Sequence, residues 1–519
     1  MSNPFYITTP IYYVNDEPHL GHAYTTILAD VLARYARLRG DDVFFLTGTD
    51  EHGQKVQESA RRRGVEPLAH ADAMQEHFRA AWQELGVTYD DFIRTTQARH
   101  VRVVQQVLQD LWDRGEIYLG GYQGWYCVHE ERFWTNKDLV NNACPDCGRP
   151  VEKVVEANYF FRMSTYQGWL LDMLQSNPDF IQPAFRRNEV LGFLRQPLGD
   201  LCISRPVNRL NWGIPLPFDH QFVTYVWFDA LLNYITAAGY GQNPARFNQF
   251  WPQATHLIGK DILTTHCVYW PIMLKAAGLP LPRRIFAHGW WSGVDDPKTA
   301  APRTPGHAGT RIRGKTIRPL DLAHTYGVDA LRYFLMREMS PGMDAEFSNA
   351  RLAECYRNDL SNNLGNLLNR VVSMTWRYFN GMVPTPAALD SPGEDLCRQV
   401  QGLPGRVFKL VDAFAPNQAL AEMMEVLTAA NQYLERTAPW KLAEAGETSR
   451  LASVLYTAAE SLRLVSVLLW PVLPAKTAEI WAQLGWVPPA PLSHGLAWGG
   501  LKPGAHVADP RPLFPRLEN

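Results

Sequence analysis

The chain has few cysteines for its length and no apolar run long enough to cross a membrane. Its seven cysteines among 519 residues are odd in number and irregularly spaced, which argues against a disulfide framework. No uninterrupted apolar stretch approaches the ~18 residues of a membrane span, and the N-terminus lacks the charged and apolar segments of a secretory signal. These absences lead us to expect a cytoplasmic protein with no membrane partner.

The chain also lacks an excess of either charge, an internal repeat and any low-complexity tract. A formal net charge of −2 excludes a generally basic nucleic-acid coat, although one face could still be locally basic. A length of 519 residues is too great for a single hydrophobic core and predicts roughly three or four structural units.

The most informative stretch comprises residues 8–22, where an apolar, β-rich start ends at Pro10 and an HLGH sequence opens an amphipathic helix. Its histidines, His19 and His22, lie on one helix face beside backbone N–H groups that attract phosphate. Gly21 leaves room there for a flat base. Two unrelated surface histidines are the alternative, but the strand–loop–helix setting favours a nucleotide site.

Four further motifs follow. They are TGTDEHG at residues 47–53, YVWFDA at 225–230, GKDI at 259–262 and HGW at 288–290. Together with HLGH, this order and spacing resemble the methionyl family of class I aminoacyl-tRNA synthetases over nearly the whole chain, from about Phe5 to Arg516. The β-α-β order of residues 1–115 itself predicts a parallel sheet with ligands at the carboxyl ends of its strands.

The resemblance implies an α/β, Rossmann-like class I synthetase catalytic domain with a connective insertion, followed by an all-α helical bundle. The expected segments are 1–115 and 216–300 for the two halves of the nucleotide-binding fold, 116–215 for the insertion with its zinc knuckle, 301–355 for a divergent KMSKS-type loop and linking helices, 356–484 for an anticodon-binding-like bundle, and 485–519 for a tail that packs back on the body.

The resemblance also implies which residues hold ATP, which we expect together with Mg²⁺. His19 and His22 would hold phosphate oxygens and the developing charge, and Asp261 would take a ribose hydroxyl. The full ATP-binding set comprises Tyr12, His19, Gly21, His22, Gly259, Asp261, His288 and Gly289.

A second implied set encloses the amino acid. Residues 223–227 predict a strand, and His266 and Trp270 follow with helical spacing. A methionine thioether favours aromatic edges over charged donors, and Asp50, after a buried strand, would hold the α-ammonium group. Without the resemblance, these side chains could equally be core, and Asp50 a turn residue. The set comprises Tyr13, Asp50, Trp227, Tyr234, Ile262, His266 and Trp270.

Residues 292–316 stand where members of this family carry a KMSKS loop, but the segment is longer, rich in Pro and Gly, and contains no KMSKS. Two alignments compete: one places Arg311 at the second lysine of the motif, and the other keeps Lys315. A cation here would clamp the triphosphate as pyrophosphate leaves, so Arg311 and Lys315 join His19 and His22 as catalytic candidates. The alternative is a surface loop with solvated charges. Two further cations are available, Arg303 and Arg313.

Two cysteine corners in the insertion predict a zinc knuckle. Cys127, Cys144 and Cys147 are three soft ligands, and Glu130 stands where metal-bearing relatives have a cysteine, so Glu130 or His129 could complete the site. A metal-free knuckle with reduced thiols is the alternative.

Long amphipathic runs after Leu320 predict an antiparallel helical bundle. Asn366, Arg370 and Trp440 are similar to the family's anticodon-contacting set, since an amide, a planar cation and an indole suit unpaired bases. A helix cap and a buried tryptophan are the alternative.

The predicted function is ATP-dependent activation of methionine, or a close analogue, to an aminoacyl-adenylate and its transfer to tRNA(Met), by a monomeric ligase of the methionine–tRNA ligase type. A related biosynthetic enzyme would pass the activated amino acid to a small hydroxylamine or amine instead. A non-catalytic protein that binds tRNA or an amino acid is the third hypothesis.

Overall fold

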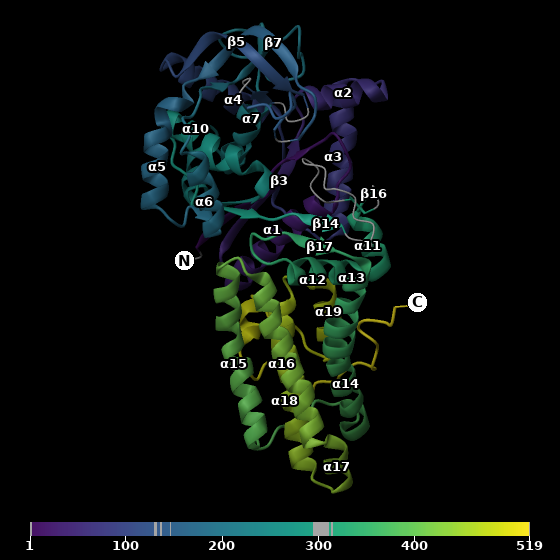
Figure 1. The fold of residues 1–519 in the computed structure, drawn as a ribbon. Helices are drawn as coiled ribbons and strands as arrows, with labels where there is room; N and C mark the ends of the chain where they lie inside the picture. The colour runs from purple at the N-terminus through teal and green to yellow at the C-terminus, as the bar shows by residue number, and fades with distance from the viewer. Residues whose placement is uncertain are drawn as a thin grey trace.

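The computed structural model describes residues 3–128, 132–134, 138–145, 147–293, 311–312 and 315–517. An α/β half and a helical half lie end to end (Figure 1). Seven of the described strands form the main parallel sheet, in the order β2-β3-β1-β12-β13-β8 with β4 paired to β3. These strands are β1 (Pro4–Thr8), β2 (Tyr12–Tyr13), β3 (Asp42–Asp50), β4 (Asp91–Arg94), β8 (Ile181–Gln182), β12 (Ala254–Gly259) and β13 (Arg284–His288).

The strand order reverses at the centre of this sheet. β1 pairs with β3 on one side and with β12 on the other, although the whole insertion separates β1 from β12 in the sequence. Helix α1 (Leu20–Arg39) begins at this same edge. Such a reversal leaves a crevice at the carboxyl ends of the strands, where parallel sheets bind ligands.

Successive residues of each central strand face two different cores, as the pleat of a strand requires. One core contains Ile7, Phe45, Leu257 and Phe286 and continues through α1 into the helical half. The other contains Tyr6, Phe44, Ile258 and Ile285, with the helices α4 (Ala98–Asp113), α8 (Asn233–Ala238) and α10 (Trp270–Ala277). The main sheet and the bundle therefore share one continuous core.

The insertion contains a four-stranded antiparallel sheet at the end of the molecule remote from the bundle (Figure 1). Its order is β6-β5-β7-β9, formed by β5 (Ile117–Cys127), β6 (Arg132–Trp134), β7 (Glu152–Phe161) and β9 (Leu201–Cys202). The same segment carries α5 (Gln167–Ser176), α6 (Ala184–Phe193) and β8, and β8 joins the main sheet beside β13. Only part of residues 116–215 thus stands apart from the main sheet.

The strand predicted over residues 223–227 is confirmed for Val223 and Thr224 and wrong for the residues after them. β11 (Phe222–Thr224) ends first, and residues from Val226 onward form the helix α7 (Val226–Leu231). Asp229 in this helix is buried against two histidines, and such tertiary contacts outweigh the strand preference of the aromatic and β-branched residues before it.

The helical half is an antiparallel bundle below the sheet (Figure 1). It is built from α13 (Asn349–Cys355), the π-helical η5 (Tyr356–Gly365), α14 (Asn366–Phe379), α15 (Ser391–Asp412), α16 (Pro416–Thr437), α17 (Pro439–Glu444), α18 (Thr448–Leu469) and α19 (Pro474–Gln483). Among the described residues, α18 alone has the length and apolar character of a membrane span, but its apolar window is fully buried inside the protein. It is the central core helix of the bundle.

Shorter elements complete the fold. They are α2 (Gln54–Arg63), α3 (Pro67–Glu84), η1 (Met163–Tyr166), β10 (Ser204–Pro206), α9 (Pro244–Phe250), η2 (Trp251–Gln253), η3 (Lys260–Ile262), η4 (Thr265–Tyr269), β14 (Trp291–Gly293), β15 (Arg311–Ile312), β16 (Lys315–Thr316), α11 (Pro319–Tyr326), α12 (Val328–Glu338), β17 (Ala345–Phe347) and η6 (Leu492–Leu496). The C-terminal segment returns to the bundle, where Leu501, Val507, Leu513 and Phe514 are buried.

Candidate nucleotide and amino-acid site

A cavity of about 380 Å³ lies where the central strands end. Its lining includes Pro10, just beyond β1, and the last residues of β3, β12 and β13, which are Asp50, Gly259 and His288. All eight residues predicted to bind ATP line this cavity: Tyr12, His19, Gly21, His22, Gly259, Asp261, His288 and Gly289. Their individual roles stay predictions.

The two histidines of HLGH form the N-terminal cap of α1. His19 Nδ1 accepts hydrogen bonds from the backbone N–H groups of Gly21 at 3.1 Å and His22 at 3.4 Å. His22 Nδ1 accepts from the His19 N–H at 3.4 Å, and the rings stack with centroids 3.6 Å apart. Because both Nδ1 atoms accept, each neutral ring carries its proton on Nε2 and has an N–H left to donate.

Burial keeps both rings uncharged. It lowers the pKa of His19 to about 4. Burial, with a smaller contribution from the neighbouring His19, lowers the pKa of His22 well below its ordinary value. At neutral pH these side chains can act on an anion as N–H donors at a helix start, where the backbone adds partial positive charge. Tyr12 packs its ring 4.7 Å from that of His22 and supports this end of the cavity.

The opposite side suits a nucleoside. Thr25 Oγ1 and His288 Nε2 lie 2.7 Å apart and join α1 to the end of β13. A Cβ atom at Gly259 would collide with the Asp261 carboxylate, and one at Gly289 would collide with backbone at residues 343–344. Gly289 is therefore required by close packing against backbone, and a side chain at Gly259 would displace the Asp261 carboxylate.

Asp261 has a partner that the sequence did not predict. The indole N–H of Trp290 donates to Asp261 Oδ1 at 3.0 Å, and the Lys260 ammonium group lies 4.3 Å from the centroid of the Trp290 ring. Trp290 and Thr25 both line the cavity. Trp290 belongs to the HGW motif and could have been named from it, whereas nothing in the sequence marks Thr25.

The amino-acid end of the cavity is aromatic and carries one carboxylate. Asp50 closes β3 and is 5 % exposed, and Tyr13 pairs with it on β2. Tyr234 Oη donates to His266 Nε2 at 2.8 Å, because His266 Nδ1 donates to the Ile262 carbonyl at 3.0 Å. Six of the seven residues predicted for the amino acid line the cavity: Tyr13, Asp50, Trp227, Tyr234, Ile262 and His266.

Trp270 does not line the cavity. It is fully buried one layer behind, where its indole N–H donates to His256 Nε2 at 3.2 Å. His266 lies in the π-helical turn η4, and the additional residue of such a turn rotates the next residues relative to an α-helix. Lys55, which lines the cavity with its ammonium group 5.3 Å from the Tyr13 ring, was missed because it follows the TGTDEHG motif without being part of it.

Two cationic candidates of the divergent loop, Arg311 and Lys315, belong to a short antiparallel hairpin. β15 and β16 pair Arg311 with Thr316 and Ile312 with Lys315. The carbonyl of Ile317, which follows, accepts from the Leu20 N–H at 3.1 Å, so the hairpin is anchored at the start of α1. Arg303 and Arg313 lie outside the described residues.

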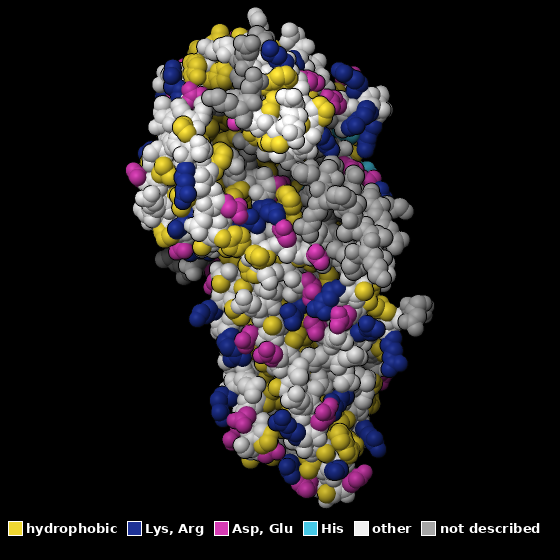
Figure 2. All heavy atoms as spheres, viewed as in Figure 1, with side chains coloured by type: hydrophobic (Ala, Val, Ile, Leu, Met, Phe, Trp, Pro, Cys, Tyr) yellow, Lys and Arg dark blue, Asp and Glu magenta, His cyan; other side chains and the backbone are white. Residues whose placement is uncertain are grey.

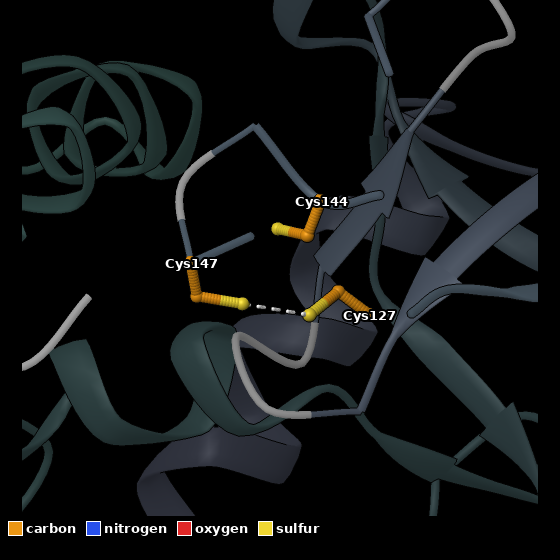
Figure 3. A group of neighbouring side chains, drawn as sticks. All are labelled: Cys127, Cys144 and Cys147. Carbon is orange, nitrogen blue, oxygen red and sulfur yellow. Dashed lines mark hydrogen bonds between the residues drawn. The ribbon is translucent and has the colours of Figure 1, made fainter. Parts of the chain in front are cut away.

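The three knuckle cysteines come together in the insertion. The sulfur atoms of Cys127, Cys144 and Cys147 all lie within 4.8 Å of one another and are buried (Figure 3). Burial raises the pKa of the Cys147 thiol, and the other two thiols raise it further, so three thiolates would need a cation among them. Glu130 and His129, the predicted fourth ligands, lie outside the described residues.

The predicted anticodon trio lies on α14 and α17, and α17 is at the end of the bundle remote from the sheet (Figure 1). Arg370 Nη1 and Asn366 Nδ2 both donate to Asn431 Oδ1, at 3.2 and 3.4 Å. Trp440 is 40 % exposed, so it is not a core residue. Basic and acidic side chains are intermixed over this part of the surface (Figure 2).

Comparison with known proteins identifies the family. The family model described as tRNA synthetases class I (M) matches residues 5–154 and 137–372. The chain belongs to this family. The methionine–tRNA ligase of Caldanaerobacter subterraneus subsp. tengcongensis is 45 % identical over 520 residues, which cover 100 % of this chain and 80 % of that ligase. The corresponding ligase of Thermosynechococcus vestitus is 44 % identical over 532 residues, covering 100 % and 98 %.

Solved structures agree with this assignment. Mycobacterium tuberculosis methionyl-tRNA synthetase bound by methionyl-adenylate superposes with a TM-score of 0.93 at 38 % identity, covering 99 % of this synthetase and 100 % of that chain. The predicted fold class, an α/β class I catalytic domain followed by a helical bundle, is confirmed.

Proposed function

We propose that this chain is a methionine–tRNA ligase, which activates methionine with ATP and transfers it to tRNA(Met). One observation carries the proposal: a helix start with two neutral histidines and an aromatic pocket with a carboxylate line the same cavity, an arrangement that suits an aminoacyl-adenylate. The T. vestitus relative, which this chain covers over 98 % of its length, is a methionine–tRNA ligase. The similar M. tuberculosis enzyme holds methionyl-adenylate.

In the proposed reaction, a methionine carboxylate oxygen attacks the α-phosphorus of ATP, and pyrophosphate leaves. No protein nucleophile is needed, so the residues act by positioning and by stabilising charge. The neutral rings of His19 and His22 donate Nε2–H groups to phosphate oxygens, Asp50 holds the α-ammonium group, and Asp261 exchanges the Trp290 indole for a ribose hydroxyl. Mg²⁺ that arrives with ATP would neutralise part of the triphosphate charge.

Lys315 is the proposed cation for the leaving pyrophosphate, since its hairpin is tied to the start of α1, beside His19. Lys315→Ala should slow adenylate formation much more than it weakens methionine binding, whereas Arg311→Ala should change the rate less. The reverse order would assign the role to Arg311.

The knuckle supports a zinc site with structural function. Cys127, Cys144 and Cys147 supply three of the four ligands that tetrahedral zinc takes, and Glu130 is the proposed fourth. Bound zinc would hold the corner between β5 and β7 in place of a hydrophobic core.

Two assays test the function. Methionine-dependent exchange of pyrophosphate into ATP reports activation, and charging of purified tRNA(Met) reports transfer. We expect both with methionine. Exchange without charging would support the enzyme that uses a small hydroxylamine or amine acceptor, and no exchange with any amino acid would leave only a binding protein.

A further inference from the structure

Asp229 is buried directly behind the amino-acid half of the cavity and holds two histidines from separate elements. Its Oδ2 accepts from His52 Nδ1 at 2.6 Å, and its Oδ1 accepts from His100 Nε2 at 2.6 Å. Asp229 and His100 are 0 % exposed, and His52 is 6 % exposed. A carboxylate withdrawn from water is tolerated only when partners satisfy both oxygens, and here each oxygen has one.

These contacts connect two walls of the cavity. His52 follows Asp50 by two residues in the loop after β3, and Asp229 follows Trp227 by two residues on α7. Asp50 and Trp227 line the cavity, whereas His52, Asp229 and His100, all described residues, do not. The hydrogen bond from His52 to Asp229 therefore links the wall that carries the Asp50 carboxylate to the wall that carries the Trp227 indole.

The wall that carries Asp50 is held by the nine-residue central strand β3, whereas the wall that carries Trp227 depends on contacts outside its own short helix. α7 has six residues, and a helix that short depends on tertiary contacts for its position. The loop after β3 is fastened on its other sides, by the Glu51 N–H to Thr95 Oγ1 at 2.9 Å and by the Gly53 N–H to the Trp212 carbonyl at 3.2 Å. The hydrogen bond from His52 to Asp229 ties this loop to α7.

The two hydrogen bonds from His52 and His100 depend on Asp229 being ionised. Burial acts to raise the pKa of Asp229, but His52 and His100 outweigh burial and the pKa is lowered. An ionised carboxylate can accept one N–H on each oxygen, whereas the amide of asparagine has a single oxygen and would turn its NH₂ group toward the other ring.

We propose that Asp229, held between His52 and His100, is a positioning residue for the amino acid: it fixes the spacing between Asp50 and Trp227, and thereby the distance between the sites for the ammonium group and the side chain. This inference rests on the proposed function, because it assigns the amino acid to that end of the cavity. A displacement of about 1 Å in such a wall is enough to weaken productive binding by an order of magnitude or more.

The test compares the KM values for methionine and for ATP in the exchange reaction. Asp229→Asn should raise the KM for methionine by about tenfold or more and change the KM for ATP by less than about threefold. Asp30→Asn is the matched control, since Asp30 is likewise 0 % exposed and held by two side chains, Arg34 and Arg332, but lies away from the cavity. It should leave the ratio of the two KM values unchanged.

A second pair of variants keeps the test decisive if Asp229→Asn does not fold. His52→Asn retains an N–H near the position of Nδ1, whereas His52→Ala removes it, so His52→Asn should restore most of the methionine affinity lost in His52→Ala. Equal losses in these two variants, equal rises of both KM values, or the same shift in Asp30→Asn would overturn the inference. Absence of exchange in the unmodified enzyme would instead refute the proposed function.

Discussion

The Arg332 guanidinium group lies 2.6 Å from the Asp30 carboxylate, and both side chains are completely buried. Asp30 is on α1, the helix that HLGH opens, and Arg332 is on α12. Arg332 also donates to the carbonyls of Leu85, Pro471 and Val472. One side chain thus joins the helix that HLGH opens to the segment that follows the central bundle helix α18.

Replacing Arg332 with Met should destabilise the protein strongly. The substitution leaves the buried Asp30 charge without one of its two cations and strands three carbonyls, and breaking a buried pair in this way costs about 3–5 kcal/mol. Arg351→Met is the control, because Arg351 also pairs with two carboxylates but is 48 % exposed, so the loss should stay below about 1 kcal/mol. Urea unfolding followed by tryptophan fluorescence measures both, and similar midpoints would contradict the expectation.

Tyr234→Phe should weaken methionine binding. The hydroxyl of Tyr234 donates to His266 Nε2 at 2.8 Å and orients this ring at the cavity wall. Without that hydrogen bond the ring can turn away from the amino acid, and we expect the KM for methionine to rise roughly 5–30-fold, which corresponds to about 1–2 kcal/mol. Tyr35→Phe is the control, because it removes an equally buried hydroxyl that donates to the Leu468 carbonyl. It should lower the stability of the protein without changing the KM for methionine. A similar change of KM in both variants would show that the effect is general.

His19 should not titrate between pH 6 and 8 in the free enzyme. Its pKa is lowered to about 4 by burial, so the ring stays neutral until the pH falls well below 6, and only then does protonation remove the neutral form. The ratio of kcat/KM for ATP between the unmodified enzyme and His19→Asn, which keeps a capping oxygen, should therefore be constant from pH 6 to 8. A ratio that increases on acidification with a midpoint near 6.5 would instead identify an active imidazolium.

The purified protein should carry about one zinc ion per chain, as expected for a structural site with three cysteine ligands. Cys144→Ser should lose it, because Cys144 is one of the three clustered thiols, whereas Cys355→Ser, a buried cysteine outside the cluster, should keep it. Elemental analysis of both variants, expressed with added zinc, distinguishes them. Equal zinc contents would contradict the proposed knuckle.

Much of the cavity could be predicted because its residues occur in motifs at the ends of strands. Apolar strands such as β3 are visible in the sequence, and a parallel sheet places the residues after them along one edge. His19, Asp50, Asp261 and His288 therefore come together as expected.

The failures have local physical causes. Trp270 has helical spacing from His266, but the π-helical turn at Thr265–Tyr269 rotates it behind the cavity, and no sequence signal marks such a turn. Residues at the start of α7 have strand-forming side chains, and tertiary contacts such as those of Asp229 outweigh that preference. β8 has two residues, too few for any periodic pattern.

Trp440→Ala should separate the two half-reactions. Trp440 is 40 % exposed on α17, remote from the cavity, and stacking of an unpaired base on an aromatic ring contributes about 1–3 kcal/mol. Charging of tRNA(Met) should therefore fall by about 5–150-fold in kcat/KM, while methionine-dependent pyrophosphate exchange stays unchanged. Trp376→Ala is the control, since its indole donates to the Ala508 carbonyl within the bundle. If both variants lose charging in proportion to their stability, Trp440 does not contact the tRNA, and the role predicted for it in anticodon contact is wrong.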